Sequence, residues 1–451
     1  MTQLACSDSY LVQCIARTRQ HREAAALALT HVDMDGVQAQ AAALDERLKA
    51  GEKAGPLAGL TCTIKACFDV KGWTTHAGSA ALLDAPPAQE DAALVSRLRQ
   101  SDALVFAQTN MTEFAYGALG LNAHFGTPRT PLCADGEHVA GGSSSGAAVS
   151  VALGFADLAL CSDTSGSARI PAGFCGVVGM IPTAGRFDTR GMLGLSPSFD
   201  VPGIMARSVA VCTRAYAALC SQPAECIVGA GRISEHAKPL SLCIPEWVFD
   251  ADIDPGVFEL FHRAIERLQA HGINVSRREL ATTVGLGAIA AEGGVIAADA
   301  YALHRDLLVE HGDHYEPLVR QRIEAGATVL AWKYGEAQRT LALRAMQYEA
   351  ELHEFDAMLT PTSPIFPPRL STLQDEDRYL ALNKKSFAFT EIANRLGKPS
   401  ISIPLGDLSR KPAALLLTGK SGQDESLLRV ASLLERILSP NHTEGVINDS
   451  H

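Results

Sequence analysis

Residues 141–183 read GGSSSGAAVSVALGFADLALCSDTSGSARIPAGFCGVVGMIPT. Glycine and serine crowd together at 141–146 and again at 163–167, and apolar runs separate the two clusters. A flexible linker would lack those apolar runs, so the stretch is interpreted as buried, tightly turning backbone. Small residues let backbone N–H groups approach a ligand closely, and consecutive N–H groups form an anion-binding nest. A serine in such a nest combines a nucleophile with an oxyanion site.

The chain around this stretch alternates short apolar runs with helix-like segments. LTCTIKACFDV (60–70) and DALVFAQT (102–109) predict strands, and AALVSRLRQ (92–100) between them predicts a helix. Further strands are predicted in AMLTPTSP (357–364), KPSISIP (398–404) and AALLLTG (413–419), and DESLLRVASLLERIL (424–438) predicts a closing helix. This alternation is typical of an α/β protein, with a central sheet flanked by helices.

We interpret residues 1–451 as one domain with four parts. Residues 8–52 are rich in Ala and Leu and predict two helices, divided near 33–36. Residues 55–210 form the catalytic core, and residues 255–350 are mostly helical by period, which predicts a helical layer inserted in the second half. Residues 355–438 complete the core.

Composition limits the classes of function. Apolar residues make up 47% of the chain, and the formal net charge is −11, which argues against a nucleic-acid partner. Eleven cysteines without a CxxC pair indicate reduced thiols. The N-terminal sequence lacks a signal peptide, and the longest apolar stretch, 147–161, is too short to span a bilayer. We therefore expect a cytoplasmic protein without a membrane partner.

Lys65 is a candidate base. In the strand 60–70 it shares one face with Thr61 and Thr63 and is surrounded by apolar sequence. Burial disfavours a lysine cation, so its pKa falls and it can accept a proton. The residues alone also permit a surface lysine with a buried stem.

Together these elements resemble the amidase-signature family. That family reads GGSSGG and, about a helix and a strand later, DTGGS-x-R-x-PA-x-x-CG-x-x-G-x-KPT. Here the serines at 143 and 167 are 24 positions apart, which fits that spacing. Segments 56–65, 109–114, 126–131, 360–362 and 393–406 resemble other parts of the family, so the resemblance covers about 55–435.

The resemblance implies a fold and a set of roles. The fold is a large central mixed β-sheet covered by helices on both faces. Ser167 matches the nucleophile, Ser143 the bridging serine after a cis Gly142–Ser143 bond, and Lys65 the terminal base. The oxyanion hole is expected from the backbone N–H groups of Thr164, Ser165, Gly166 and Ser167. The resemblance implies no metal and no organic cofactor.

The sequence departs from the family at Ser165, where glycine is common, at Ala66 in place of an aspartate, and at Ile181 in place of a lysine. Ser144 is expected to be a hydrogen-bond partner of Lys65 by its family position. Asp163 is expected to stabilise its turn by accepting backbone N–H bonds. Arg169 has two interpretations, a buried ion pair under the active loop or a clamp for a substrate carboxylate.

Other motifs have simpler interpretations. Ser144 also fits a G-x-S-x-G nucleophile elbow, but the polar residues CADGEHVA precede it where that elbow needs a buried strand. The histidines at 304, 311 and 314 lack a zinc motif and are interpreted as structural or solvated. Cys175 lacks a basic partner and is interpreted as a packing residue.

The expected acyl pocket is compact and largely apolar, with wall candidates Tyr116, Phe125, Leu195 and Phe199. Isolated aromatic residues of this kind are equally common in a core. The function that the resemblance implies is hydrolysis of a small-molecule carboxamide to a carboxylate and ammonia through a seryl acyl-enzyme. The alternative is the glutamine-hydrolysing subunit of a tRNA-dependent amidotransferase, and a third possibility is a non-catalytic scaffold. A homodimer would be ordinary for this family.

Overall fold

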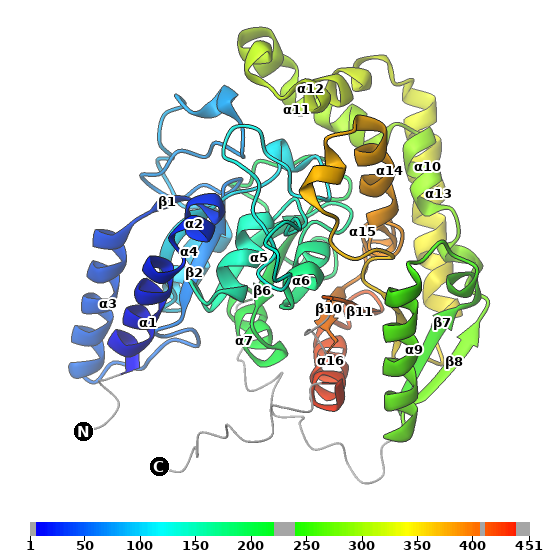
Figure 1. Ribbon diagram of the computed structural model, residues 1–451, viewed down its shortest axis with the longest axis horizontal. Coiled ribbons are helices and arrows are strands. Elements are labelled where there is room, and N and C mark those ends of the chain that lie inside the picture. Colours follow the sequence, from blue (N-terminus) through cyan, green and yellow to red (C-terminus); the bar gives the residue numbers. More distant parts are fainter. Residues whose placement is uncertain (1–5, 221–239, 406–410, 439–451) are drawn as a thin grey trace.

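The computed structural model describes residues 6–220, 240–405 and 411–438 (Figure 1). Within these ranges eleven strands form one mixed sheet in the order β1-β3-β2-β4-β6-β5-β10-β11-β9-β7-β8. The strands are β1 (Leu29–Val32), β2 (Thr61–Lys65), β3 (Leu104–Thr109), β4 (Leu158–Asp163), β5 (Val178–Ile181), β6 (Val201–Ala206), β7 (Ser241–Pro245), β8 (Asn274–Arg278), β9 (Ala357–Pro361), β10 (Ser400–Pro404) and β11 (Ala414–Thr418). The strands predicted from apolar runs are thereby confirmed.

Helices connect and cover these strands. They are α1 (Cys6–Gln20), α2 (Arg22–Ala28), α3 (Met34–Lys49), α4 (Ala93–Gln100), α5 (Ser145–Ala152), α6 (Arg169–Cys175), α7 (Val209–Leu219), α9 (Pro255–Ala270), α10 (Leu286–Glu292), α11 (Val295–His311), α12 (Pro317–Glu324), α13 (Ala331–Glu351), α14 (Glu376–Ser386), α15 (Glu391–Leu396) and α16 (Asp424–Leu438). The closing helix α16 has the predicted bounds.

Alternate residues of the central strand β4 pack on opposite faces of the sheet. Leu158 and Leu160 belong to the core cluster that includes α7, whereas Ala159 and Cys161 belong to the cluster that includes α5. Since successive strand residues point to opposite sides, helices cover both faces, as expected. β2 lies between β3 and β4 and is parallel to both, and each of its residues is buried. Its sequence, TCTIK, alternates polar and apolar residues, so polar side chains of β2 are buried as well.

The N-terminal part differs from the prediction of two helices. The helical run is broken at His21, and a short strand, β1, pairs antiparallel with β3 at the sheet edge. The predicted division near 33–36 is confirmed, because Asp33 caps α3 by accepting a hydrogen bond of 2.8 Å from the backbone N–H of Gly36. Residues 29–32 were missed because edge pairing, not periodicity, makes them a strand.

The inserted layer is helical from α10 to α13, but it follows a strand that the prediction missed. β8 has the sequence NVSRR and pairs parallel with β7 at the opposite edge of the sheet. Polar residues are common on an edge strand with one side in water, so apolar periodicity does not identify it.

Two further features concern the described residues taken together. The nine cysteines whose side chains are described are all free thiols. Among the described residues no single helix has both the length and the apolar character needed to cross a membrane. Only a pair bent by 41°, Ala281–Glu292 with Val295–His314, meets that criterion jointly.

Candidate active site

Lys65 is the last residue of β2, and its side chain is fully buried. Its Nζ lies 2.7 Å from Oγ of Ser143 and 2.8 Å from Oγ of Ser162. Burial lowers the pKa of Lys65 below its usual range, and the thiols of Cys67 and Cys161 and the nearby carboxylates oppose this only partly. The site therefore favours a neutral amine in direct contact with the Ser143 hydroxyl.

Ser143 lies immediately before α5, and the Gly142–Ser143 peptide bond is cis, as expected. The Ser143 carbonyl accepts a hydrogen bond of 3.0 Å from the backbone N–H of Thr112. Gly142 packs so closely that an added Cβ would lie 2.6 Å from the backbone nitrogen of Gly120. Only glycine fits there, which explains part of the glycine cluster that opens the 141–183 stretch.

Ser167 lies in the loop 164–167, between β4 and α6. Its carbonyl accepts a hydrogen bond of 3.2 Å from the backbone N–H of Ser144, so the two serine loops contact each other. Together with Thr164 and Ser165, it lines a large cavity. The predicted nucleophile is therefore accessible to a ligand.

The loop around Ser167 contains backbone donors that the protein does not use. In the described part of the chain, the N–H groups of Ser165, Gly166 and Ser167 donate to no protein acceptor. Gly166 has φ +143°, a conformation that residues with a Cβ rarely adopt. These unused donors are available to an oxyanion, and the oxyanion hole expected from the sequence stays a prediction.

Thr390 and Arg395 support this loop through hydrogen bonds, and neither residue was predicted from the sequence. Arg395 donates through Nη1 to the Thr164 carbonyl at 3.0 Å and through Nη2 to Oγ of Ser165 at 2.8 Å. Thr390 donates to the Ser165 carbonyl at 2.6 Å. The contact with Arg395 gives a reason for serine at 165, where the family commonly has glycine.

Arg169 forms a fully buried, bidentate ion pair with Asp163, with N–O distances of 3.0 and 2.8 Å. Asn394 accepts a further hydrogen bond of 2.7 Å from Arg169. Burial by itself would raise the pKa of Asp163, but Arg169 outweighs it and holds that pKa below the usual range. The structure thus places Arg169 in the structural ion pair and not in a substrate clamp.

Ser144 was expected to form a hydrogen bond with Lys65, but in the described part of the chain its hydroxyl has a different partner. Its hydroxyl donates to the Ser162 carbonyl at 3.2 Å, and the Ser162 hydroxyl contacts Lys65 instead. The Ser144 hydroxyl is bound to a backbone carbonyl. Ser162 lies on β4, the strand beside β2, which brings its hydroxyl close to Lys65. The sequence signal for Ser162 was slight, a polar residue near the end of an apolar strand.

Asp200 is a second carboxylate near the loop. It accepts hydrogen bonds from the Thr164 hydroxyl and from the backbone N–H groups of Leu195 at 2.8 Å and Ser196 at 2.9 Å. Burial raises its pKa to about 6, although these hydrogen bonds favour the charged form. Asp200 therefore ties the 191–199 segment to the oxyanion loop.

The cavity above Ser167 has a volume of about 1020 Å³. Of the four predicted wall residues, Tyr116 and Leu195 line it. Phe125 instead stacks on His76 with ring centroids 4.4 Å apart, and Phe199 packs under the Arg395 guanidinium at 4.3 Å. Both rings are used for packing, so the predictions for Phe125 and Phe199 were wrong.

Most of the surface that lines the cavity is apolar, as expected. Its small walls come from Gly and Ala residues of α10 and the start of α11, and six charged side chains also line it: Asp252, Arg322, Lys384, Lys385, Glu391 and Arg395. The expectation of a compact site needs correction, because the cavity is large.

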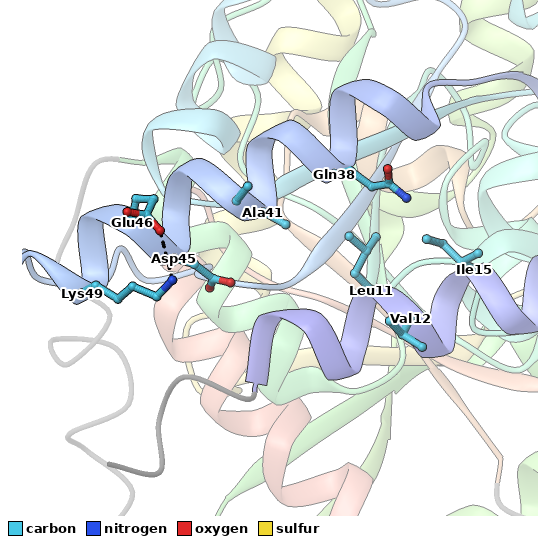
Figure 2. A pocket seen from close by; sticks show the side chains of 9 residues that line it. Leu11, Val12, Ile15, Gln38, Ala41, Asp45, Glu46 and Lys49 are labelled. Atoms are coloured by element: carbon cyan, nitrogen blue, oxygen red, sulfur yellow. Dashed lines mark hydrogen bonds and ion pairs between the residues drawn. The ribbon is translucent and has the colours of Figure 1, made fainter.

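A second hollow, of about 370 Å³, lies between α1 and α3 (Figure 2). Leu11, Val12 and Ile15 face the side chains of α3 there, and acidic residues stand at one end. Within the described part of the chain, its lining includes none of the predicted site residues. Of the candidate catalytic residues, Ser167 lines the larger cavity, whereas Ser143 and Lys65 are fully buried.

Comparison with known proteins identifies the family of the chain. A family model described as Amidase matches residues 11–428, so the chain belongs to the amidase family and is an amidase-signature hydrolase. It is 34% identical to 2-amino-5-chloromuconic acid deaminase of Comamonas testosteroni, over 90% of this chain and 88% of that protein. It is 32% identical to the A subunit of the glutamyl-tRNA(Gln) amidotransferase of Symbiobacterium thermophilum, over 95% and 93%. A crystal structure of an amidase superimposes with a TM-score of 0.85 at 31% identity, over 95% and 96% of the two chains.

Proposed function

We propose that this enzyme hydrolyses a small carboxamide to a carboxylate and ammonia through an acyl-enzyme on Ser167. The observation that carries the proposal is the buried contact of 2.7 Å between Lys65 Nζ and Ser143 Oγ, beside a serine that lines the cavity. A desolvated amine, a bridging hydroxyl and an accessible hydroxyl next to unused N–H donors are the parts that serine acyl transfer needs.

The proposed proton path uses the contact between Lys65 and Ser143 and a transfer from Ser167 to Ser143. Ser167 Oγ attacks the amide carbon while its proton passes to Ser143 Oγ, whose own proton passes to the lone pair of neutral Lys65. The oxyanion binds the backbone N–H groups of the loop. The proton returns through Ser143 to the leaving nitrogen, the C–N bond breaks, and ammonia departs. Water then attacks the acyl ester, loses its proton along the same path, and releases the carboxylate.

The charges of the cavity indicate an anionic acyl group. Of its four cations, Lys385 pairs with Asp252 at 2.6 Å and Arg395 pairs with Glu391 at 3.3 Å. Arg322 forms no ion pair within the described residues, and its guanidinium lies 3.9 Å above the Tyr116 ring. One N–H donates to the Tyr116 carbonyl at 2.8 Å, which leaves other donors for a ligand.

A guanidinium fixed in this way suits a carboxylate, which it can bind with two parallel hydrogen bonds. The deaminase relative is also named for an acid substrate. We therefore propose that the acyl group carries a carboxylate at the Tyr116 side of the cavity.

The test measures ammonia release by the purified protein from a panel of amides, among them the monoamide of succinate, butanamide and glutamine. Ser167→Ala runs beside the wild type. Release that the variant lacks, with the succinate monoamide preferred to butanamide by about tenfold or more, is the expected result. Equal release by both proteins would refute acyl transfer by Ser167. Weak release from glutamine alone would favour the alternative function, that of the glutamine-hydrolysing subunit of a tRNA-dependent amidotransferase.

A further inference from the structure

Glu391 presents a carboxylate to the cavity that the proposed mechanism does not use. It is the first residue of α15, and its side chain is 23% exposed. Its Oε2 lies 3.3 Å from Nη2 of Arg395, one helical turn later. In the described part of the chain Oε1 has no hydrogen-bond partner. The Glu391 side chain is among those that line the cavity above Ser167.

The opposite wall is shaped around this carboxylate. Gly287 of α10 lies so close that an added Cβ would be 2.0 Å from Oε1 and 2.6 Å from Cδ of Glu391. Glycine inside a helix costs about 0.5–1 kcal/mol relative to alanine. Here it provides the space in which the carboxylate lies. Apart from Ile296, the cavity residues that follow it on α10 and at the start of α11 are also small, being Ala or Gly.

The negative charge of the Glu391 carboxylate is only partly balanced by the cations around it. Burial raises the pKa of Glu391 above its usual range, and Arg395 and Lys384 reduce that effect without removing it. Arg395 shares its guanidinium with Thr164 and Ser165, so it cannot turn fully toward Glu391. A buried acceptor in this state gains from any additional donor, and most from a cationic one.

Glu391 is also near the reacting atoms. Arg395 Nη2 bridges Oε2 of Glu391 and Oγ of Ser165, and Ser165 is two residues before Ser167. A group bound at Oε1 would therefore belong to the same acyl chain whose carbonyl lies in the oxyanion loop.

From these contacts we infer that Glu391 determines specificity by accepting a hydrogen bond from a protonated amine on the acyl group, beyond the scissile carbonyl. The substrate class is then an amino-substituted carboxamide. The inference deepens the proposed function and depends on it, since the carbonyl must lie at Ser167. Glu391 acts here as a binding residue and takes no part in proton transfer.

The test compares two amides of equal size, 4-aminobutanamide and pentanamide, which differ only in an ammonium against a methyl group. We expect the wild type to favour 4-aminobutanamide in kcat/KM by about tenfold or more. Glu391→Gln keeps an acceptor for Arg395 but lacks the charge. Its ratio of the two kcat/KM values should fall by about tenfold, mainly through KM for the amine.

Two further variants make the result specific. Gly287→Ala pushes against the carboxylate and should lower the ratio in the same direction. Glu336→Gln removes an exposed carboxylate of α13 and should leave the ratio unchanged. A wild type that favours pentanamide or treats both alike would overturn the inference, as would a Glu391→Gln ratio equal to that of the wild type. Turnover of no amide at all would instead overturn the proposed function, and the inference with it.

Discussion

Ser162→Ala tests whether Lys65 needs a fixed orientation to act as a base. The amine contacts Ser143 at 2.7 Å, the Ser162 hydroxyl at 2.8 Å and the Ser162 carbonyl at 3.5 Å. A neutral amine has two N–H donors and one lone pair. If both donors are directed at Ser162, the lone pair is left for the Ser143 hydroxyl. Removal of the Ser162 hydroxyl frees the amine to rotate away from that arrangement.

The expected size follows from one buried hydrogen bond. Its net value is about 0.5–1.5 kcal/mol, and the cost of an unpaired buried group reaches about 3 kcal/mol. Since about 1.4 kcal/mol corresponds to tenfold in rate, kcat/KM should fall by roughly 3- to 100-fold. The hydroxyl also favours the ammonium form, so its loss should lower the pKa of Lys65 further. Activity requires the neutral amine, and its rise with pH should therefore shift to lower pH.

The assay is ammonia release against pH for the best amide of the panel. Ser150→Ala is the matched control, because that buried hydroxyl contacts Thr63 at 2.9 Å, two residues before Lys65 on the same strand. We expect kcat/KM of the control to stay within about threefold of the wild type. A Ser162→Ala enzyme with wild-type kcat/KM and an unshifted pH profile would refute the orienting role.

Four other variants, one of them a control, test the loop and the buried charges of the site. Gly166→Ala should lower kcat by about 100-fold or more, because its Cβ would lie 2.2 Å from a side-chain oxygen behind the loop. Gly185→Ala is the control: Gly185 has φ +80° and nothing lies within 4 Å of an added Cβ, so the variant should cost only about 1 kcal/mol of stability. Equal losses of kcat in the Gly166 and Gly185 variants would contradict an effect of the clash at Gly166. Arg169→Leu leaves Asp163 buried without its cation and should lower the free energy of unfolding in urea by about 3–5 kcal/mol, so a loss below about 1 kcal/mol would exclude this role. Burial raises the pKa of Asp200 to about 6, so the wild type should lose stability relative to Asp200→Asn as pH rises from about 4 through 6. A difference in urea midpoint that is the same at pH 4 and pH 7 would contradict that sign.

Much of the fold was predictable because its central strands are buried on both faces. Residues 104–109 and 414–418 read as nearly unbroken apolar runs, residues 61–65 alternate polar with apolar residues, and each segment forms a strand. The edge strands 29–32 and 274–278 were missed because one side of each lacks a neighbouring strand, which permits polar residues.

The 24 positions between Ser143 and Ser167 fit the motif of the family, and the resemblance to that family is what assigned roles to both serines and to Lys65. α5 and β4 occupy that interval. Ser162 and Arg395 were not predictable in the same way. Each acts through a contact with a residue distant in sequence, 97 positions away for Ser162 and Lys65 and 230 for Arg395 and Ser165.

The wall of the cavity was the least predictable part. Tyr116 and Phe199 are both aromatic residues beside glycine-rich loops, yet only Tyr116 lines the cavity. Phe199 lies beneath a guanidinium that approaches from α15. Which ring faces a ligand depends on what packs against its other side, and local sequence does not contain that information.

The 230 positions between Ser165 and Arg395 have a consequence for synthesis of the protein. A ribosome adds about 5–20 residues per second, so the loop that contains Ser167 is synthesised roughly 10–50 seconds before Arg395. During that interval the nascent chain contains the serine but lacks the support behind the oxyanion donors. The loop is therefore supported only after residue 395 has been added, and a shorter nascent chain contains Ser167 without those hydrogen bonds.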